Sequence, residues 1–390
     1  MRALLAAAVV VAFSGSVRAA DPPLAEKFLH SSKLDEGEAV LSAVLRRHPT
    51  DDETRFGLGM VQFTNAVQKF GRQLHKYGVK TEEVAGIPFV RLPVPRNPNP
   101  TPINYGLFRK LFDDLYHDLG TAERTLAGVT DDTIKLRLRL AAVRFDFDGS
   151  GRGNDKFTDV LVKLLGQSPE FLRKDPDFLV CFDRGDVAWL RAYCHLLQSM
   201  IDVFLALDLR EFYQSDLHKQ FAKAEDQVGG DQPNLFTFRI KFASPERLGQ
   251  FRKHMLQVCA LNRETWKSIR AETDDDHEWL PNPKQKGVIG LPVRDEMIDG
   301  WLAAVAEVEE LLEGKTLVPI GFLPNTNGKA LNLKTLLDNP PAELSVQKLL
   351  ANGPDAKYLE KGRESDFRAI SRVERVFGNT LSVAYAAWFN

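Results

Sequence analysis

The chain has 390 residues, with 51 basic and 53 acidic side chains and a formal net charge of −2. This balance provides no bulk electrostatic attraction for nucleic acid or for anionic membranes, so we expect no nucleic-acid partner. Hydrophobic residues make up 44% of the chain and charged residues 27%, which excludes wholesale disorder. At roughly 100–200 residues per domain, the length allows two or three units that can each bury a core.

Residues 1–19 have the pattern of a secretory signal peptide. Arg2 supplies the positive start, residues 3–13 form an unbroken apolar run, and Val17 and Ala19 place small side chains before the expected cleavage point. The apolar run is too short to span a bilayer, and no later segment approaches the roughly 18 apolar residues that a membrane helix needs. The sequence therefore predicts an extracytoplasmic protein, periplasmic or secreted, without a membrane span. A membrane anchor or a buried first helix is the alternative.

The three cysteines are too few for a disulfide scaffold. Cys194 lies in a helical pattern beside Leu190 and Leu197, which is a core position, and a free buried cysteine behaves as a small hydrophobic residue. We therefore expect a buried thiol at this position. A bridge between Cys181 and Cys194 is the alternative, because connectivity cannot be deduced from sequence.

Residues 20–82 are predicted to form a helix pair. Apolar side chains recur three and four positions apart from residue 24 to 45, and Pro49 then marks a helix end and restart. With Leu58 and Gly59 in the second helix, the spacing resembles a tetratricopeptide repeat. No further copy follows at the period of about 34 residues, so this unit is expected to pack on the rest of the chain. The resemblance implies a face that binds a peptide or partner protein; a plain helix pair is the alternative.

Residues 83–104 contain six prolines and are predicted to form an extended arm. Phe89, Val90, Leu92 and Val94 lie between the prolines. These apolar side chains favour an arm packed on the body of the protein over a free linker.

Residues 105–390 are predicted to be a mainly helical body. Segments with helical periodicity or helix start and stop signals follow one another along it: 105–126, 157–165, 183–207, 245–272, 297–312 and 366–377. Residues 134–140 instead alternate between apolar and charged side chains, which is typical of a half-buried strand, and pairing with residues 87–94 would make a small sheet. The expected fold class is mainly α, with helical-repeat-like helix pairs and a small β element.

Residues 146–157 resemble the calcium loop of the EF-hand family. Four side chains stand at positions where that loop supplies oxygen ligands: Asp146, Asp148, Ser150 and Asn154. Gly151 stands where the loop turns sharply, but Phe157 replaces the final bidentate Glu, and a strand pattern replaces the first helix. The resemblance implies a structural calcium bound by these four residues. A tight Asp/Gly/Ser turn that caps the following helix is the alternative.

A polar stretch suggests an acid–base pair between Asp186 and His195. Nine residues apart on one helix, these side chains point about 180° away from each other. We therefore favour Asp183 as a helix cap and a solvated face for Arg191 and His195. The acidic run at residues 274–278 contains one histidine without a second at ligand spacing, so we expect it to be solvated.

No nucleophile elbow, zinc-protease helix motif or Cys-x-x-Cys pair occurs in the chain. The expected function is therefore a non-catalytic binding or scaffolding protein of the cell envelope, with a protein or peptide partner and one structural calcium. The alternative is an extracytoplasmic hydrolase whose acid and base come from distant segments. A pocket joining Asp183 or Asp186 to a carboxylate or histidine of another helix would favour that alternative. As a whole the chain resembles exported bacterial proteins, which implies no activity.

Overall fold

The computed structural model describes residues 21–80, 92–165, 175–226, 239–377 and 388–389. The predicted signal peptide at residues 1–19 lies outside this part, as do Phe89 and Val90 of the predicted arm.

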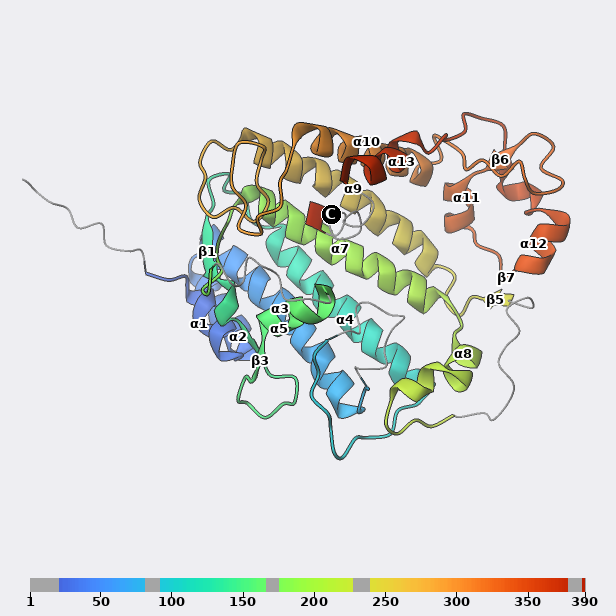
Figure 1. Cartoon of the computed structure of the whole chain (residues 1–390). Helices are drawn as coiled ribbons and strands as arrows, with labels where there is room; N and C mark the ends of the chain where they lie inside the picture. The colour runs from blue at the N-terminus through green and yellow to red at the C-terminus, as the bar shows by residue number, and fades with distance from the viewer. Residues whose placement is uncertain (1–20, 81–91, 166–174, 227–238, 378–387, 390) are drawn as a thin grey trace, which may run out of the picture.

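The described chain is mainly α-helical with small two-stranded sheets, which confirms the predicted fold class (Figure 1). The helices are α1 (Leu24–Ser31), α2 (Leu34–Arg47), α3 (Asp52–Lys76), α4 (Tyr105–Leu126), α5 (Phe157–Leu165), α7 (Arg184–Ala206), α8 (Arg210–Ser215), α9 (Arg247–Ala271), α10 (Asp295–Leu312), α11 (Leu333–Asp338), α12 (Val346–Asn352) and α13 (Arg368–Phe377). The strands are β1 (Leu136–Arg139), β2 (Arg144–Phe145), β3 (Asp155–Lys156), β4 (Leu179–Phe182), β5 (Arg239–Lys241), β6 (Ala330–Leu331), β7 (Glu343–Ser345) and β8 (Leu359–Glu360).

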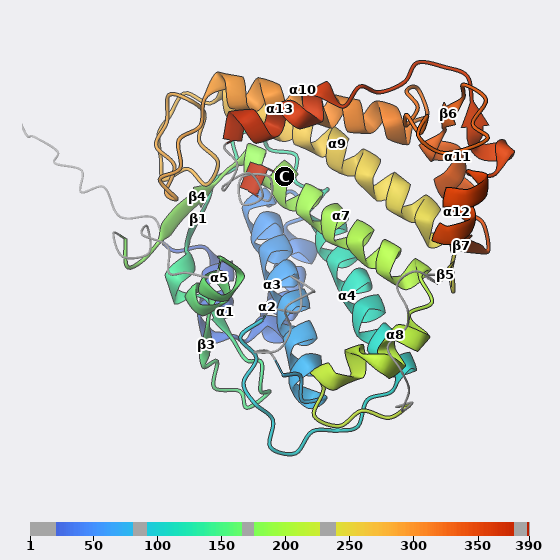
Figure 2. The same ribbon diagram turned by 45° about the vertical axis from the view of Figure 1, so that its right-hand side comes forward.

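The long helices pack side by side in one series, in which α2, α3, α4, α7, α9, α10 and α13 each contact the next (Figures 1 and 2). Local signals start several of them. Asp51 accepts a hydrogen bond from the backbone N–H of Thr54 (3.0 Å) at the start of α3, and Asn104 accepts one from Leu107 (2.9 Å) at the start of α4. These side chains satisfy backbone donors that have no partner inside the helix.

One large apolar core joins α1, α3, α4 and the near face of α7. Its centre is aromatic: Phe112 is fully buried, and its ring centroid lies 4.3 Å from that of Phe204 and 5.4 Å from that of Phe108. Close approach of α3 to α4 requires Gly59, since a Cβ there would stand 2.4 Å from a methyl carbon of Leu126. Within residues 20–82, the described chain forms three helices, α1, α2 and α3, and not the predicted pair. They pack on the body, as expected for a unit too short to stand alone.

The described part of the arm also joins this core, because Leu92 and Val94 are buried in it. Thr101 further along donates a backbone hydrogen bond to the carbonyl of Lys76, at the end of α3 (2.9 Å). These contacts agree with a packed arm.

The predicted strand is present as β1, whereas residues 87–91 of its expected partner lie outside the described residues. β1 pairs antiparallel with β4, with Leu136 opposite Phe182, whereas Leu92 and Val94 belong to no strand. Alternation reveals that one face of a strand is buried, but it does not reveal which distant segment supplies the hydrogen bonds. The pairing matters for function because β4 ends where α7 begins.

The cysteines at positions 181, 194 and 259 are free and buried, which confirms the buried thiol predicted at Cys194 and excludes the bridge to Cys181. Within the described ranges, no helix combines the length and the apolar character needed to cross a membrane.

Candidate metal centre

The predicted calcium loop lies between β2 and β3, and the oxygens of its first position are bound by protein groups. Asp146 is buried; its Oδ2 accepts from Arg72 (2.7 Å) and its Oδ1 accepts from the backbone N–H of Gly151 (3.1 Å). The guanidinium therefore supplies the positive charge that a cation would supply. Gly151 has a φ of +77°, a left-handed conformation that favours glycine.

The remaining loop residues make local bonds. Asp148 accepts a hydrogen bond from the backbone N–H of Ser150 (2.9 Å), Ser150 Oγ lies within 3.4 Å of the backbone nitrogen of Arg152, and Asn154 is exposed. These are the bonds of a tight Asp/Gly/Ser turn, the alternative stated above. The calcium loop stays a prediction.

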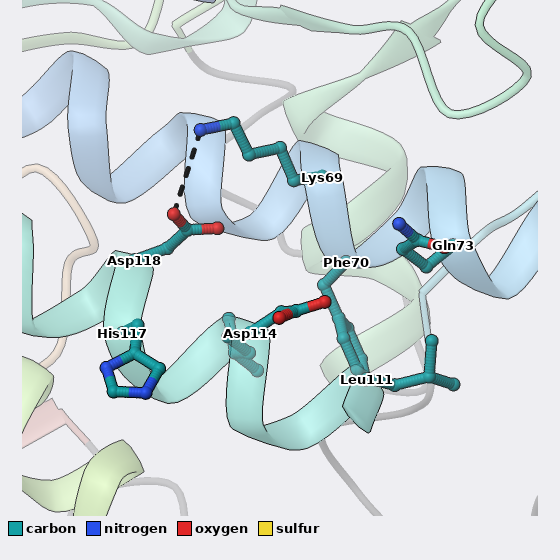
Figure 3. Close-up of a pocket in the computed structure, with 8 residues that line it drawn as sticks. Lys69, Phe70, Gln73, Leu111, Asp114, His117 and Asp118 are labelled. Atoms are coloured by element: carbon teal, nitrogen blue, oxygen red, sulfur yellow. Dashed lines mark ion pairs between the residues drawn. The ribbon is translucent and has the colours of Figure 1, made fainter. Parts of the chain in front are cut away.

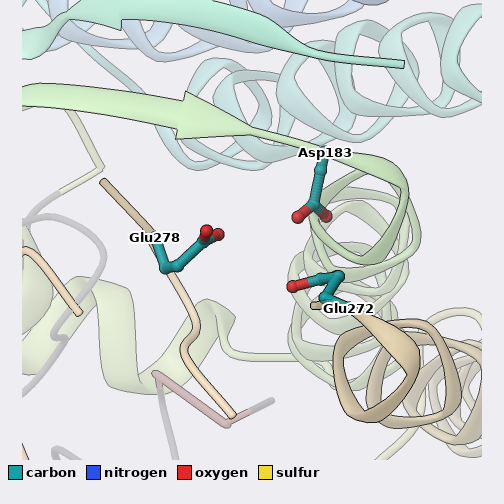
Figure 4. Close-up of side chains that lie close together, drawn as sticks. All are labelled: Asp183, Glu272 and Glu278. Carbon is teal, nitrogen blue, oxygen red and sulfur yellow. The ribbon is translucent and has the colours of Figure 1, made fainter. Parts of the chain in front are cut away.

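A different set of carboxylates comes together at one end of α7 and α9. Asp183, Glu272 and Glu278 each bring one oxygen within 4.8 Å of the others (Figure 4). In the described part of the chain, they are the one group of three or more acidic, histidine or cysteine ligands that meets this distance. We call these three residues the carboxylate cluster.

Asp183 is fixed by a capping box at the start of α7, which confirms its predicted role. Its carboxylate accepts from the backbone N–H groups of Gly185 (2.8 Å) and Asp186 (3.4 Å), and Asp186 Oδ2 accepts from the backbone N–H of Asp183 in return (3.1 Å). A Cβ on Gly185 would stand 2.7 Å from Ile269 of α9. Glycine at this position therefore lets the end of α9 approach the cap.

The loop that follows α9 folds back over its own helix end. Glu272 is the C-cap residue that directly follows α9, and Gln285 donates a hydrogen bond to its Oε2 (3.3 Å). Asn282 donates to the carbonyls of Ile269 (3.1 Å) and Glu272 (3.2 Å), at the helix end where carbonyls lack their usual partners. The returning loop places Glu278 opposite Asp183, where it is 3% exposed.

A fourth carboxylate stands behind the cluster. Asp186 is 3% exposed, and its Oδ1 is buried without a hydrogen-bond partner among the described residues. Burial raises its pKa well above the usual value, and the charges of Asp183, Glu272 and Glu278 add to the rise. A buried carboxylate oxygen without a partner is costly, and the raised pKa of Asp186 reflects that cost.

No ion pair to a lysine, arginine or histidine compensates these four carboxylates within the ranges that the structure covers. Two basic side chains at the start of β1 are bound elsewhere: Lys135 pairs with Asp274, and Arg137 pairs with Asp276. The acidic run at residues 274–278 is therefore divided, because these two aspartates are held at β1 and its glutamate is directed to the cluster. The expectation that this run is solvated is wrong for Glu278.

Because these carboxyl groups are buried without an ion-pair partner in the described chain, their pKa values are raised. Burial, together with the charge of Asp183 and a hydrogen bond between the two carboxyl groups, raises the pKa of Glu272 to about 9. Burial raises the pKa of Glu278 to about 7, and the charge of Asp183 contributes. At neutral pH without a cation, Glu272 thus stays protonated, and its O–H donates a hydrogen bond to Asp183.

The same oxygens suit a hard divalent cation. Calcium binds oxygen at about 2.3–2.6 Å, so two ligands of one ion lie at most about 5 Å apart. The cluster meets this limit, and its donors are carboxylates, which favour calcium or magnesium over softer metals. Asp183 was singled out from sequence, whereas Glu272 was not. The sequence feature that could have identified Glu272 is an acidic residue at a helix C-terminus, where the helix dipole favours a positive charge.

A cavity of about 300 Å³ lies elsewhere, between α3 and α4 (Figure 3). It is lined by Lys69, Phe70, Gln73, Leu111, Asp114, Leu115, His117 and Asp118. Lys69 lies 3.7 Å from Asp118 and 3.9 Å from Asp35, so two carboxylates already neutralise its charge. This cavity shares no residue with the carboxylate cluster.

Comparisons with protein-family models, with curated proteins and with solved structures find no match to this chain. The chemistry of the site therefore follows from its own geometry.

Proposed function

We propose that this protein is a non-catalytic binding or scaffolding protein whose helical body is closed by one divalent cation at Asp183, Glu272 and Glu278. The observation that carries the proposal is the convergence of these three carboxylates on one point without a basic partner in the described chain. Calcium is the cation that the oxygen donors and their spacing favour.

A cation at this point would tie three segments together. It would join the start of α7, the end of α9 and the loop that carries Glu278. It would also relieve the repulsion among the carboxylates, and the negative C-terminal end of the α9 dipole favours it further. The expected consequence is a gain in stability, which makes the ion structural.

The test compares thermal unfolding in EDTA, in millimolar calcium and in millimolar magnesium. Ligand at 100 times its dissociation constant adds about 2.7 kcal/mol to the free energy of unfolding, enough to raise the melting temperature measurably. We expect calcium to raise it in the wild type and not in Glu278→Gln, which keeps the side-chain size and removes the charge.

Asp148→Asn is the matched control, because it removes one carboxylate from the predicted calcium loop and leaves the cluster intact. A calcium shift retained in Asp148→Asn and lost in Glu278→Gln supports the cluster. The reverse pattern assigns the ion to the loop of residues 146–157. A wild type without any calcium shift overturns the proposal for both positions.

Export and a protein or peptide partner are part of the same proposal. The signal-like residues 1–19 support export. N-terminal sequencing of protein recovered outside the cytoplasm is expected to begin at Ala20 or Asp21. Protein that starts at Met1 and stays in the cytoplasm would contradict export.

A second candidate function is hydrolysis, because Asp183 lies beside carboxylates from another helix and an adjoining loop. Two carboxyl groups that share a hydrogen bond are a recurrent acid–base arrangement; here burial raises both pKa values, that of Glu272 to about 9. A screen of chromogenic ester and glycoside substrates tests it. Turnover that disappears in both Asp183→Asn and Glu272→Gln would favour the hydrolase; no turnover in the wild type favours the structural role.

A further inference from the structure

A second polar cluster lies further along the contact between α7 and α9. Nδ1 of His195 on α7 and Nδ1 of His254 on α9 are 2.8 Å apart, so the two imidazoles contact each other directly. Glu123 of α4 lies 3.5 Å from the other nitrogen of His195, and Asp202 of α7 lies 3.7 Å from the other nitrogen of His254. The four groups form one chain across three helices: Glu123, His195, His254 and Asp202.

The face that carries His195 is therefore covered, and the expectation that it is solvated is wrong. The side chains of His195 and His254 are 13% and 14% exposed, and Asp202 is fully buried. Helical periodicity placed Arg191 and His195 on one face but did not show that α4 and α9 pack against it.

The short distance between the two Nδ1 atoms requires one proton between them. A hydrogen bond needs one donor and one acceptor, so one of the two nitrogens carries a proton and the other carries none. The carboxylates at the outer ends favour N–H groups that face them. Two arrangements satisfy both conditions, because either Nδ1 can carry the single proton between the rings. In both, Nε2 of His254 lies 3.0 Å from the Tyr116 hydroxyl and 3.7 Å from Asp202.

The charges around this chain are balanced on each packed helix. On α4, Glu123 lies 3.0 Å from Arg191 of α7, and the Tyr116 hydroxyl lies 3.0 Å from His254 Nε2. On α9, Arg247 bonds Asp202 of α7 (3.1 Å) and Asp113 of α4 (2.6 Å). Glu123 and Asp202 thus each have a guanidinium partner. The proton between the two imidazoles is therefore the charge at the ring contact that can change with pH.

We propose that His195 and His254 form a proton-sensitive clasp, which joins α7 to α9 with one shared proton at neutral pH and opens when both imidazoles are protonated in acid. With both protonated, two N–H groups would point at each other across 2.8 Å and two positive charges would be adjacent. The helices must then separate at this point. The clasp does not depend on the proposed cation, since none of its groups belongs to the carboxylate cluster.

The direction of the pH effect follows from His254. Burial lowers its pKa to about 4, and the neighbouring His195 contributes. The unfolded chain therefore takes up a proton below about pH 6.5 that the folded chain does not accept until about pH 4. The contribution of His254 to stability is full above this window and is lost as the pH falls through it. One such proton raises the unfolding equilibrium constant up to about tenfold per pH unit.

The test measures urea unfolding of the full chain in EDTA from pH 4.5 to 7.5. Two variants are compared with the wild type: His254→Gln, and the control His117→Gln on α4, where the side chain is 71% exposed. Asp202, Glu272 and Glu278 titrate in the opposite direction, because burial raises the pKa of each, but all three remain in every variant. The readout is therefore the difference between variants: we expect wild type and His117→Gln to have the same pH slope, and His254→Gln to lose less stability, or gain more, as the pH falls.

Histidine ¹⁵N NMR of the wild type gives a direct measurement. We expect one imidazole that accepts a hydrogen bond at Nδ1 at pH 7 and stays neutral to about pH 4. Two imidazoles that titrate independently near pH 6.5, or equal pH slopes for wild type and His254→Gln, would overturn the clasp. His195→Gln takes the place of His254→Gln if the latter does not fold, with the same expected change of slope.

Discussion

The two faces of α7 carry different kinds of side chain. Toward α4, the helix presents Phe204 to the aromatic rings of Phe108 and Phe112. Toward α9, it presents Ala188 and Ala192, whose small side chains let α9 approach closely. Burial of apolar surface is insensitive to pH and to cations, whereas the second face carries titratable groups along its length. The comparison teaches that one helix can combine an apolar contact, which does not respond to pH, with contacts of titratable groups that do; Glu123 of α4 takes part in the second kind.

Removing the centre of the apolar face is expected to have the largest effect. Phe112→Ala deletes a fully buried ring that contacts Phe70, Phe108 and Phe204. Such truncations typically cost about 3–5 kcal/mol, because they lose apolar burial and leave a cavity. Urea unfolding at pH 6 and pH 8 is expected to give the same loss at both values. A loss that varies strongly with pH would contradict the assignment of this contact as apolar and independent of pH.

The carboxylate cluster is expected to give the next effect, and it depends on pH. The pKa of Glu272 is raised to about 9 from its ordinary 4.5, so the folded state holds a proton that the unfolded state has released. In EDTA its contribution is full below about pH 4.5 and is lost as the pH rises toward 9, by at most about 1.4 kcal/mol per pH unit. Glu272→Gln should flatten this slope. Millimolar calcium should oppose it in the wild type, because the cation replaces the proton.

A capping residue remote from both faces of α7 should have a smaller effect. Asp51→Ala removes the bond from the backbone N–H of Thr54 at the start of α3, which typically costs about 1 kcal/mol. The exposed neighbour Thr50 gives a control, since Thr50→Ala removes no cap. Equal losses for the two variants would show that α3 does not depend on this cap.

The smallest expected change concerns the thiols. The thiols of Cys181, Cys194 and Cys259 are buried, and burial raises the pKa of the first and third to about 11 and about 12. At neutral pH a disulfide reagent should therefore modify none of them in the folded protein and all three in denaturant. Rapid reaction of Cys194 or Cys259 in the native protein would show that the α7–α9 contact opens more readily than proposed.

Local signals allowed much of the helical framework to be predicted. The bounds of α4 and α5 match the predicted segments 105–126 and 157–165, because apolar periodicity and helix caps depend on residues within a few positions. The capping role of Asp183 was predictable for the same reason. The tetratricopeptide resemblance and the calcium loop are also local patterns, and both stay predictions.

The features that could not be predicted from the sequence depend on which distant segments contact each other. The pairing of β1 with β4, the covered face at His195 and the carboxylate cluster all depend on contacts between segments that are far apart in the chain. Asp183 and Glu278 are separated by nearly a hundred positions, and no short-range rule relates them. The sequence by itself determined the position of most long helices, since periodicity and caps are local; the break between α1 and α2 and the short helices α11 and α12 were not predicted. The tertiary structure decided which charges are left without a partner, because desolvation depends on everything packed around a group.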